Sequence, residues 1–537
     1  MPRFPGKTQP DADKLRGGYY TPDSLARAVA TWVAEAGPRL LEPSCGDGQI
    51  LRQLVREAGP EQVLGVELLP EEAEAARKCG ASVITSDFFT WFTPSDYGSF
   101  DGAAGNPPFI RFGNWREAER EPALDLMREQ GLPTSRLTNA WLPFVVASLV
   151  AVRQGGRIGL VLPAELLQVG YAAPLRSYLV DSCSEISIVA FRTLVFPGIL
   201  QEVVLLLAER GSGPAVIRTL ELDNAADLQR LDLSAAPAVR AGLHDGEKWT
   251  KYFLLPEQVD AIRALRADSR MSTLGRWASV DVGVVTGRNS FFTMTPDEAE
   301  QRDLADLTVA LVSRSQQLTG VRVTEADIES LRGTAARTRL LSVPADVTPQ
   351  THTGLRAHVA DGELHEVHLG YKCRIRRDWW RVPSVSVPDG FLLRQIHLYP
   401  RLVANEAGAT STDTVHRVRV RGNSTTAAQL SVAALNSATF AATEVVGRSY
   451  GGGLLELEPT EAELLPIPDP TLVSTALVEK VDELLRESRI EEAVHLVDQQ
   501  LLIEGLQFTS EEVTRLREAW ARLRDRRAAR GRSTRSK

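Results

Sequence analysis

The sequence predicts an α/β fold for its N-terminal part, with a mostly parallel sheet and helices on both faces. Over residues 1–210, short apolar runs typical of buried strands alternate with helical patterns. A turn containing Gly46 and Gly48 follows the first run and precedes a helix, as in nucleotide-binding α/β folds. Acidic residues follow the next two apolar runs, at Glu67 and Asp87. Together these features predict a ligand site along one edge of the sheet.

The elements follow in a regular order. We expect a helix from Pro22 to Ala36, because proline suits the first turn of a helix and Gly37 follows its end. Residues 39–51 combine a short strand, the glycine turn and the start of a helix. The other predicted elements are strands over 62–68 and 82–85, an apolar segment from 100, a helix over 139–152, and strands over 155–163, 185–189, 202–207 and just beyond 214.

The turn after the first strand is suited to a ligand without phosphate. Gly46 and Gly48 allow positive φ and a close approach of the ligand to the backbone. Glu42 and Asp47 disfavour a phosphate, so a cationic amino acid or a ribose is the better guest. Glu67 follows at the spacing at which doubly wound folds place a carboxylate on ribose hydroxyls.

The segment from Asn106 to Phe109 is the most informative stretch of the chain. Pro107 and Pro108 fix φ, lack an N–H and keep the preceding residues out of the helical region. The rigid turn therefore holds its carbonyl oxygens and the Asn106 side-chain oxygen as acceptors, beside an aromatic ring. Such a site fits a planar group that bears an NH2.

These motifs together resemble the class I S-adenosylmethionine-dependent methyltransferases, in particular the gamma-class, TaqI-methyltransferase-like amino-methyltransferases of DNA. The family's Tyr-Thr-Pro segment is matched at residues 20–22, its Glu-Pro-x-x-Gly-x-Gly motif at 42–48, and its Asn-Pro-Pro-aromatic motif at 106–109. Phe109 replaces the tyrosine of many members, so stacking is kept but a phenol hydrogen bond is lost. The resemblance is specific over residues 15–210 and looser to about residue 525.

The resemblance implies S-adenosyl-L-methionine as the cofactor and double-stranded DNA as the partner. The implied cofactor-binding residues are Tyr20, Thr21, Pro22, Glu42, Pro43, Gly46, Gly48, Glu67, Asp87 and Phe88. Tyr20, Thr21 and Pro22 would wrap the methionine end of the cofactor. Glu42 and the glycine turn would line the centre of the cofactor, and Glu67 would bind its ribose. Asp87 and Phe88 would hold the adenine.

The expected catalytic residues are Asn106, Pro107, Pro108 and Phe109. The Asn106 side-chain oxygen and the Pro107 carbonyl would accept both N–H bonds of the target amine, whose lone pair then points at the methyl group. The target base lies inside a duplex, so it must be flipped out. Phe109 would stack on it, and Phe196 resembles the family's second stacking aromatic; core packing is the alternative role for Phe196.

From the turn at residues 242–246 and the helical periodicity after residue 472, we expect a methyltransferase domain over 1–245, a mixed α+β domain over 246–470 and a helical segment with a basic tail over 471–537. The resemblance implies that the second of these is a target-recognition domain. Within the second domain, basic residues suited to phosphates and aromatics suited to stacking mix at Arg374, Arg376, Arg377 and Trp379. A solvated edge strand with its aromatics turned into the core is the other interpretation of this stretch.

Several functions remain open on the sequence. Adenine N6 and cytosine N4 make the same chemical demand, and Asn106 favours adenine because cytosine-N4 enzymes more often carry serine there. A protein-glutamine N5 methyltransferase shares the Asn-Pro-Pro-aromatic motif but is much shorter. A DNA-binding specificity protein with a relict cofactor fold is the non-enzymatic alternative, and the intact motif residues argue against it.

Composition agrees with a cytoplasmic enzyme of a restriction-modification or defence system. The four cysteines, Cys45, Cys79, Cys183 and Cys373, lack Cys-x-x-Cys spacing, so we expect neither zinc nor disulfides. We expect no membrane segment, since no apolar run reaches 18 residues. The net charge of −8 does not itself indicate nucleic-acid binding, although it can hide a basic face. No nuclease-sized extension precedes Tyr20, so a separate restriction endonuclease is a further expected partner.

Overall fold

The computed structural model describes residues 21–193, 195–196, 202–233, 236, 238–240, 248–450 and 453–533. The chain divides into two compact units, one of residues 1–253 with 529–537 and the other of residues 254–528. The domain boundary that we predict near residue 245 lies outside the described residues, and the three-part division stays a prediction. Within the described residues, no helix combines the length and apolar character needed to cross a lipid bilayer.

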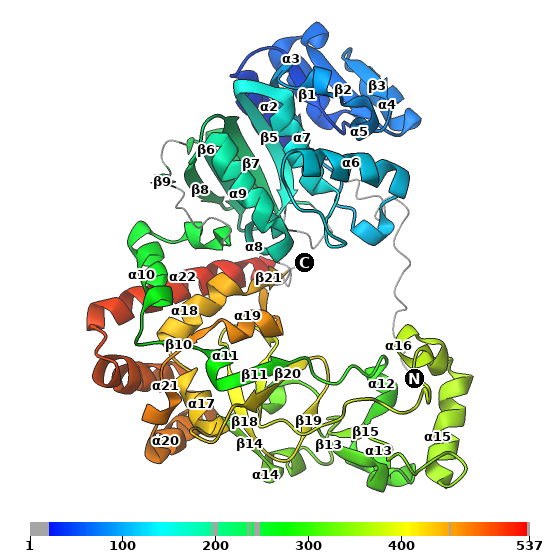
Figure 1. The fold of residues 1–537 in the computed structure, drawn as a ribbon, viewed down its shortest axis with the longest axis vertical. Coiled ribbons are helices and arrows are strands. Elements are labelled where there is room, and N and C mark those ends of the chain that lie inside the picture. The colour runs from blue at the N-terminus through cyan, green and yellow to red at the C-terminus, as the bar shows by residue number, and fades with distance from the viewer. Residues whose placement is uncertain are drawn as a thin grey trace. The chain divides into compact units, whose positions relative to one another are not determined.

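The described residues of the first unit form one nine-stranded sheet in the order β3-β2-β1-β4-β5-β7-β6-β8-β9 (Figure 1). Its strands are β1 Leu40–Glu42, β2 Val63–Glu67, β3 Ser82–Thr85, β4 Phe100–Gly105, β5 Val152–Pro163, β6 Cys183–Phe191, β7 Val203–Arg210, β8 Val216–Leu222 and β9 Ala238–Arg240. Strands β3, β2, β1, β4 and β5 pair in parallel. Strand β7 is antiparallel to both β5 and β6. This order confirms the predicted class I methyltransferase fold.

Helices cover both faces of the sheet. They are α2 Asp23–Ala34, α3 Gln49–Ala58, α4 Pro70–Arg77, α5 Phe88–Trp91, α6 Glu117–Glu129, α7 Trp141–Ala151, α8 Glu165–Gln168 and α9 Ala173–Ser182. Residues 101–105 of β4 and 158–163 of β5 are buried without a break. Because successive strand residues point to opposite faces, such runs require cover on both sides.

Helix α2 shows how the sequence produces this packing. Pro22 precedes it, and buried apolar side chains recur at helical spacing from Leu25 to Val33. That face contacts β4, β5 and α3. The helix brings residue 21, which immediately precedes Pro22, to the edge of the sheet where β4 ends, as the contact between Thr21 and Asn106 shows.

The second unit is a mixed α+β structure with several small sheets. A five-stranded sheet has the order β11-β20-β16-β18-β14 and a four-stranded sheet the order β12-β15-β13-β19, within the described residues. The strands are β10 Ser272–Thr273, β11 Ala278–Asp281, β12 Thr293–Met294, β13 Thr308–Val312, β14 Arg322–Thr324, β15 Arg339–Leu341, β16 Gly390–Leu393, β17 Gln395–Ile396, β18 Leu402–Glu406, β19 Thr410–Ser411, β20 Val415–Val420, β21 Arg448–Tyr450, β22 Leu454–Glu456 and β23 Pro466–Ile467.

The helices of the second unit are mostly short until the chain passes residue 470. They are α10 Pro256–Ala267, α11 Leu274–Trp277, α12 Asn289–Phe292, α13 Pro296–Gln301, α14 Glu325–Glu329, α15 Thr353–Leu364, α16 Tyr371–Arg374, α17 Ala427–Ala433, α18 Ser437–Val446, α19 Pro459–Glu463, α20 Thr475–Arg486, α21 Ile490–Val497 and α22 Ser510–Ser533. A π-helical stretch, Asp498–Gly505, continues α21. The last helices confirm the predicted helical C-terminal segment.

Candidate active site

The predicted site residues follow four neighbouring strands of the first unit. Strands β1, β2 and β3 end at Glu42, Glu67 and Thr85, two residues before Asp87. Strand β4 ends at Gly105, directly before Asn106. Because these strands are parallel and adjacent, their carboxyl ends meet at one edge of the sheet. The structure therefore brings together residues that are spread over more than sixty positions of the sequence.

The glycine turn is tied to the end of β2. The Gly46 N–H donates to Glu67 Oε2 at 2.8 Å, and the Leu69 N–H donates to Glu67 Oε1 at 2.9 Å. Gly48, with φ of 87°, forms the N-cap of α3. A carboxylate has about four acceptor positions, so Glu67 can hold the turn and still accept from a ribose. The same residue thus holds both the glycine turn and the segment that follows β2.

Glu42 is a buried carboxyl group with an unused acceptor. Its side chain is 2% exposed, and no described residue forms a hydrogen bond with its Oε2 atom. Burial raises the pKa of Glu42 well above its ordinary value, and the neighbouring Cys79 and Glu67 raise it further. A cation bound here would relieve that cost. The amino group of S-adenosyl-L-methionine is such a cation, so the residues at this position fit the cofactor.

Cys45 lies in the same turn but is not poised as a nucleophile. Burial and the nearby Glu42 carboxyl raise the pKa of its thiol above the ordinary value. The reactive form of cysteine is the thiolate, which this environment disfavours. A mechanism through a covalent cysteine intermediate has no support at this position.

Asp87 and Phe88 begin helix α5. Asp87 Oδ1 accepts from the Thr90 N–H at 2.9 Å and from Thr90 Oγ1 at 3.1 Å. Burial raises the pKa of Asp87. The Phe88 ring is 3% exposed and stacks on Phe92 and Phe144, with ring centres 5.1 and 5.6 Å apart. Its visible contacts are therefore with the aromatic core beneath the expected adenine position.

Asn106 is held by the segment that precedes helix α2. Its Nδ2 atom donates to Thr21 Oγ1 at 3.1 Å, and Thr21 is 6% exposed. With the amide nitrogen directed at Thr21, Oδ1 is the acceptor end of the side chain. The sequence motif predicts only a contact between Thr21 and the cofactor. The hydrogen bond between Thr21 and Asn106 could not be predicted from the sequence, because the two residues are 85 positions apart.

The two expected stacking aromatics lie against one hydrophobic cluster. Phe196 is 4% exposed and belongs to this cluster, and Phe109 is half-buried and packs against it. Pro107, between Asn106 and Phe109, is buried as well. Tyr20 and the residues directly after Phe196 lie outside the described residues. Leu68, 43% exposed beside Glu67, is an apolar residue at this edge that no sequence motif marks.

The predicted DNA-binding residues of the second unit separate into two kinds. Arg374 and Arg377 are exposed. Arg376 instead donates through Nη2 to the carbonyl oxygens of residues 285 and 286 at 2.9 and 2.8 Å, and burial lowers its pKa. Trp379 packs against Phe291, with ring centres 5.3 Å apart. The stretch forms helix α16 and turns, so the edge strand that we considered is not present.

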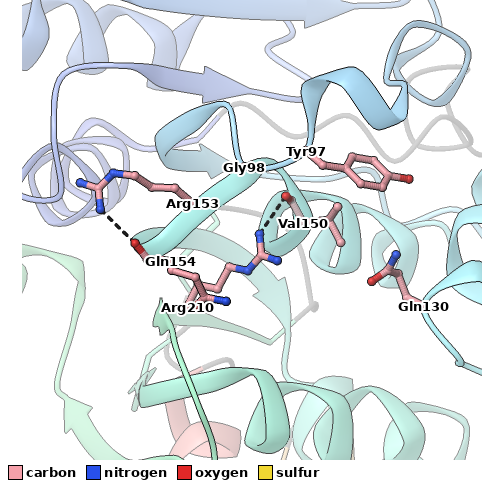
Figure 2. Close-up of a pocket in the computed structure, with 7 residues that line it drawn as sticks. All are labelled: Tyr97, Gly98, Gln130, Val150, Arg153, Gln154 and Arg210. Atoms are coloured by element: carbon pink, nitrogen blue, oxygen red, sulfur yellow. Dashed lines mark hydrogen bonds between the residues drawn. The ribbon is translucent and has the colours of Figure 1, made fainter.

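A surface pocket has a volume of about 350 Å³, and the residues that line it are drawn in Figure 2. It is lined by Tyr97, Gly98, Gln130, Val150, Arg153, Gln154 and Arg210. These residues flank the start of β5 and the end of β7, at the sheet edge opposite to Asn106. Arg210 Nη1 donates to the Val150 carbonyl and Arg153 Nη1 to the Gln154 carbonyl, both at 3.0 Å. Arg153 also forms an ion pair with Asp101, at 2.7 Å. None of the predicted site residues lines the pocket.

Two parts of the chain match models of known protein families. Residues 64–196 match the family model described as Eco57I restriction-modification methylase, and residues 246–502 match the C-terminal domain of Type II methyltransferase M.Eco57I. Type II methyltransferase M.XamI of Xanthomonas campestris pv. amaranthicola is 24% identical over 84% of this chain and 85% of its own length. Type II methyltransferase M.AccI of Acinetobacter calcoaceticus is 19% identical over 82% of this chain and 83% of its own length.

Further relatives match part of the chain. Type II methyltransferase M.TthHB8I of Thermus thermophilus is 32% identical over 40% of this chain and 50% of its own length. Among solved structures, the type IIG restriction endonuclease BpuSI covers 96% of this chain and 66% of its own, with a TM-score of 0.42 and 15% identity. Both family models are described as restriction-modification or Type II methyltransferases, and the curated relatives named here are Type II methyltransferases as well.

Proposed function

We propose that this chain transfers a methyl group from S-adenosyl-L-methionine to the exocyclic amino group of a flipped base in double-stranded DNA, and that the base is adenine, modified at N6. The observation that carries the proposal is the orientation of Asn106. Thr21 holds its amide nitrogen, so its oxygen is presented as an acceptor at the edge where β1, β2 and β4 end. An amine that is to be methylated offers N–H donors to such an acceptor.

The chemistry required of the protein is activation of a poor nucleophile. The lone pair of an exocyclic amine is delocalised into the ring. Asn106 Oδ1 and the Pro107 carbonyl accept its two N–H bonds, which favours a tetrahedral nitrogen and stabilises the positive charge that develops on it. Phe109 holds the face of the base, and the rigid Pro107-Pro108 backbone keeps the acceptors in place. The bound cofactor supplies the electrophilic methyl group.

The residues around the glycine turn are assigned to the cofactor. Glu42 would pair with its amino group, Glu67 would accept from the ribose, and Asp87 would accept from the adenine amino group. The buried, unused Oε2 of Glu42 supports the first assignment, and the place of Glu67 and Asp87 at the ends of adjacent strands supports the other two. Tyr20, Pro22 and Pro43 complete the proposed cofactor site.

DNA is proposed as the substrate because both family models belong to restriction-modification methyltransferases. The mixed α+β unit that carries the exposed Arg374 and Arg377 is proposed as the target-recognition region. A gamma-class assignment fits the order of the motifs along the chain. In this setting the methylated sequence is also the one that a separate restriction endonuclease would cut.

Single-molecule sequencing of plasmid DNA from a methylation-free host that expresses this chain tests the proposal. The expected result is N6-methyladenine at one short sequence motif. A cytosine-N4 signal at one motif would keep the mechanism and correct the base. If the expressed, folded protein binds S-adenosyl-L-methionine but leaves every base unmodified, the proposed substrate is wrong.

A further inference from the structure

A tight turn between α6 and α7 projects two side chains from the catalytic unit. In this turn, residues 135–138, the Thr138 N–H donates to the Ser135 carbonyl at 3.0 Å. The Leu137 N–H donates to Ser135 Oγ at 3.1 Å, and the Ser135 N–H donates to Thr138 Oγ1 at 3.0 Å. Three hydrogen bonds therefore fix the turn, and its two central residues are Arg136 and Leu137.

Leu137 is exposed on a firmly anchored base. Its side chain is 69% exposed, the largest fraction among the large apolar residues described in the first unit. The next residues are buried: Thr138 is 3% exposed and Trp141 is fully buried. The Leu137 side chain is thus exposed to solvent, although the residues that directly follow the turn are buried in the core. An exposed leucine does not contribute the favourable free energy that burial of its apolar surface would give. A binding partner that covers the side chain gains that free energy on binding.

The anchor of the turn is joined to the candidate catalytic segment. The Ala140 N–H donates to the Ile110 carbonyl at 2.9 Å, and Ile110 directly follows Phe109. The turn and the Asn-Pro-Pro-Phe motif are therefore held together by the backbone, within one compact unit. A target base bound at Asn106, as proposed above, would therefore bring its DNA strand near this turn.

The charges around Leu137 favour a polyanion. Arg136 and Arg111 are exposed, and neither forms an ion pair or a side-chain hydrogen bond with a residue that the structure describes. Nearby arginines are used differently, since Arg116, Arg120 and Arg128 each pair with a glutamate. Two exposed guanidinium groups, neither of them paired with a described residue, suit contacts to the phosphates that flank a stack of bases.

We propose that Leu137 is a wedge that enters the base stack where the target base leaves it, with Arg136 and Arg111 on the flanking phosphates. This inference rests on the proposed function, because it requires a flipped base in duplex DNA. A leucine inserted between base steps replaces lost stacking contacts and keeps the base from returning. A rigid turn suits this role, since its side chain is already directed outward before DNA binds.

The test compares Leu137→Ala with the wild-type protein on two duplexes that contain the motif found by plasmid sequencing. One duplex is fully paired, and the other has an abasic position opposite the target base, so that flipping costs less. Leu137→Ala should lower kcat/KM on the paired duplex by about tenfold and by no more than about threefold on the abasic duplex.

The possible outcomes distinguish the inference from the proposed function. Wild-type rates for Leu137→Ala on the paired duplex would overturn the wedge, and so would an equal loss on both duplexes. A wild-type protein that modifies no DNA would overturn the proposed function and the wedge with it. Thermal unfolding of Leu137→Ala should match that of the wild type, because the side chain makes little contact with the fold. Arg136→Ala should instead reduce the slope of log K against log salt by about one, and an unchanged slope would remove Arg136 from the proposed contact.

Discussion

At the scale of single residues, the pair of Asn106 and Thr21 determines what the site can do. An amide side chain can present either its nitrogen or its oxygen, and only the oxygen can accept an N–H bond from an amine. In the structure Asn106 Nδ2 is the atom directed at Thr21 Oγ1, at 3.1 Å, so Oδ1 is the other, acceptor end of the side chain. Thr21 is therefore a positioning residue for Asn106 in addition to a proposed contact of the cofactor.

Thr21→Val should slow methyl transfer by removing this acceptor while keeping the shape of the side chain. We expect kcat to fall by about tenfold, as a consequence of roughly 1.4 kcal/mol less transition-state stabilisation. Thr21→Ser keeps the hydroxyl group and should recover most of the rate. Transfer of a radioactive methyl group to duplex DNA measures both. An equal loss in the valine and serine variants would show that packing, and not the hydrogen bond, accounts for the effect.

Glu42 should make cofactor binding depend on pH. Burial raises the pKa of this carboxyl group in the protein without a bound ligand, so it stays protonated to higher pH than usual. A bound ammonium group favours the ionised carboxylate, so a proton must leave before the ion pair forms. The affinity for S-adenosyl-L-methionine should therefore rise as pH rises through the pKa of Glu42.

Calorimetric titration across a pH series measures this dependence. Glu42→Gln cannot ionise, so it should bind the cofactor more weakly and lose this part of the pH dependence. If Glu42→Gln shows the same pH dependence as the wild type, the ammonium group binds elsewhere.

The sequence identifies most of the residues at the site but not their environment. Two consecutive prolines, Pro107 and Pro108, predict a rigid turn because their φ angles are fixed. The position of Asn106 at the start of this turn could therefore be predicted from its neighbours. The contact with Thr21 could not, because threonine is common and the contact is long-range. Arg376 is the converse case: among basic neighbours it looks like a phosphate contact, yet it donates to two backbone carbonyl groups.

At the scale of elements, the turn between β1 and α3 depends on Gly48. Its φ is 87°, and a Cβ atom there would lie 3.0 Å from Ala76 Cα in helix α4. The glycine therefore serves both the left-handed backbone and the close approach of two helices. Its position in the sequence motif predicted the first requirement. The second depends on the packing of α3 against α4, which no local pattern reveals.

Gly48→Ala should destabilise the first unit more than Gly131→Ala. Gly131 also has positive φ, 77°, but a Cβ atom added there would meet no other atom within 4 Å, so only backbone strain applies. We expect a loss of about 1 kcal/mol for Gly131→Ala and about 2 kcal/mol or more for Gly48→Ala, where steric overlap adds to the strain. Chemical denaturation measures both, and equal losses would contradict the packing argument.

Most strands of the large sheet could be predicted from the sequence, but the direction of every strand could not. The parallel strands β1 to β5 follow from apolar runs separated by helices. Strand β7 is as apolar as its neighbours, yet it runs antiparallel between β5 and β6. A fully buried strand has the same pattern in either direction, so its direction depends on the connection and not on the residues.

At the scale of the whole molecule, the two units differ in how much the sequence reveals. Many strands of the second unit have only two or three residues, and partners such as β14 and β18 are about eighty residues apart. Such short strands carry too little periodicity to be recognised. The first unit includes longer strands, such as β5 with 12 residues, and its motifs stand at the strand ends.

Arg374 and Arg377 should contribute to DNA binding without supporting the fold. Replacement of both by alanine should weaken duplex binding and lower the slope of log K against log salt by about two, since each contact to phosphate releases about one counterion. Arg376→Ala is the contrasting variant, because it removes the two hydrogen bonds to residues 285 and 286 and should lower thermal stability. Fluorescence anisotropy at several salt concentrations measures the slope, and an unchanged slope in the double variant would exclude both arginines from the interface.

The role of Asn106 is the central claim of the proposed function, and one comparison of the wild type with one variant tests it. Methyl transfer to plasmid DNA and the binding of S-adenosyl-L-methionine should both be measured for the wild type and for Asn106→Ala. We predict that the variant binds the cofactor with nearly wild-type affinity but loses at least about a hundredfold in kcat, because the amine loses an acceptor that it needs in the transition state. A variant that methylates DNA at the wild-type rate would contradict the assignment of the active site.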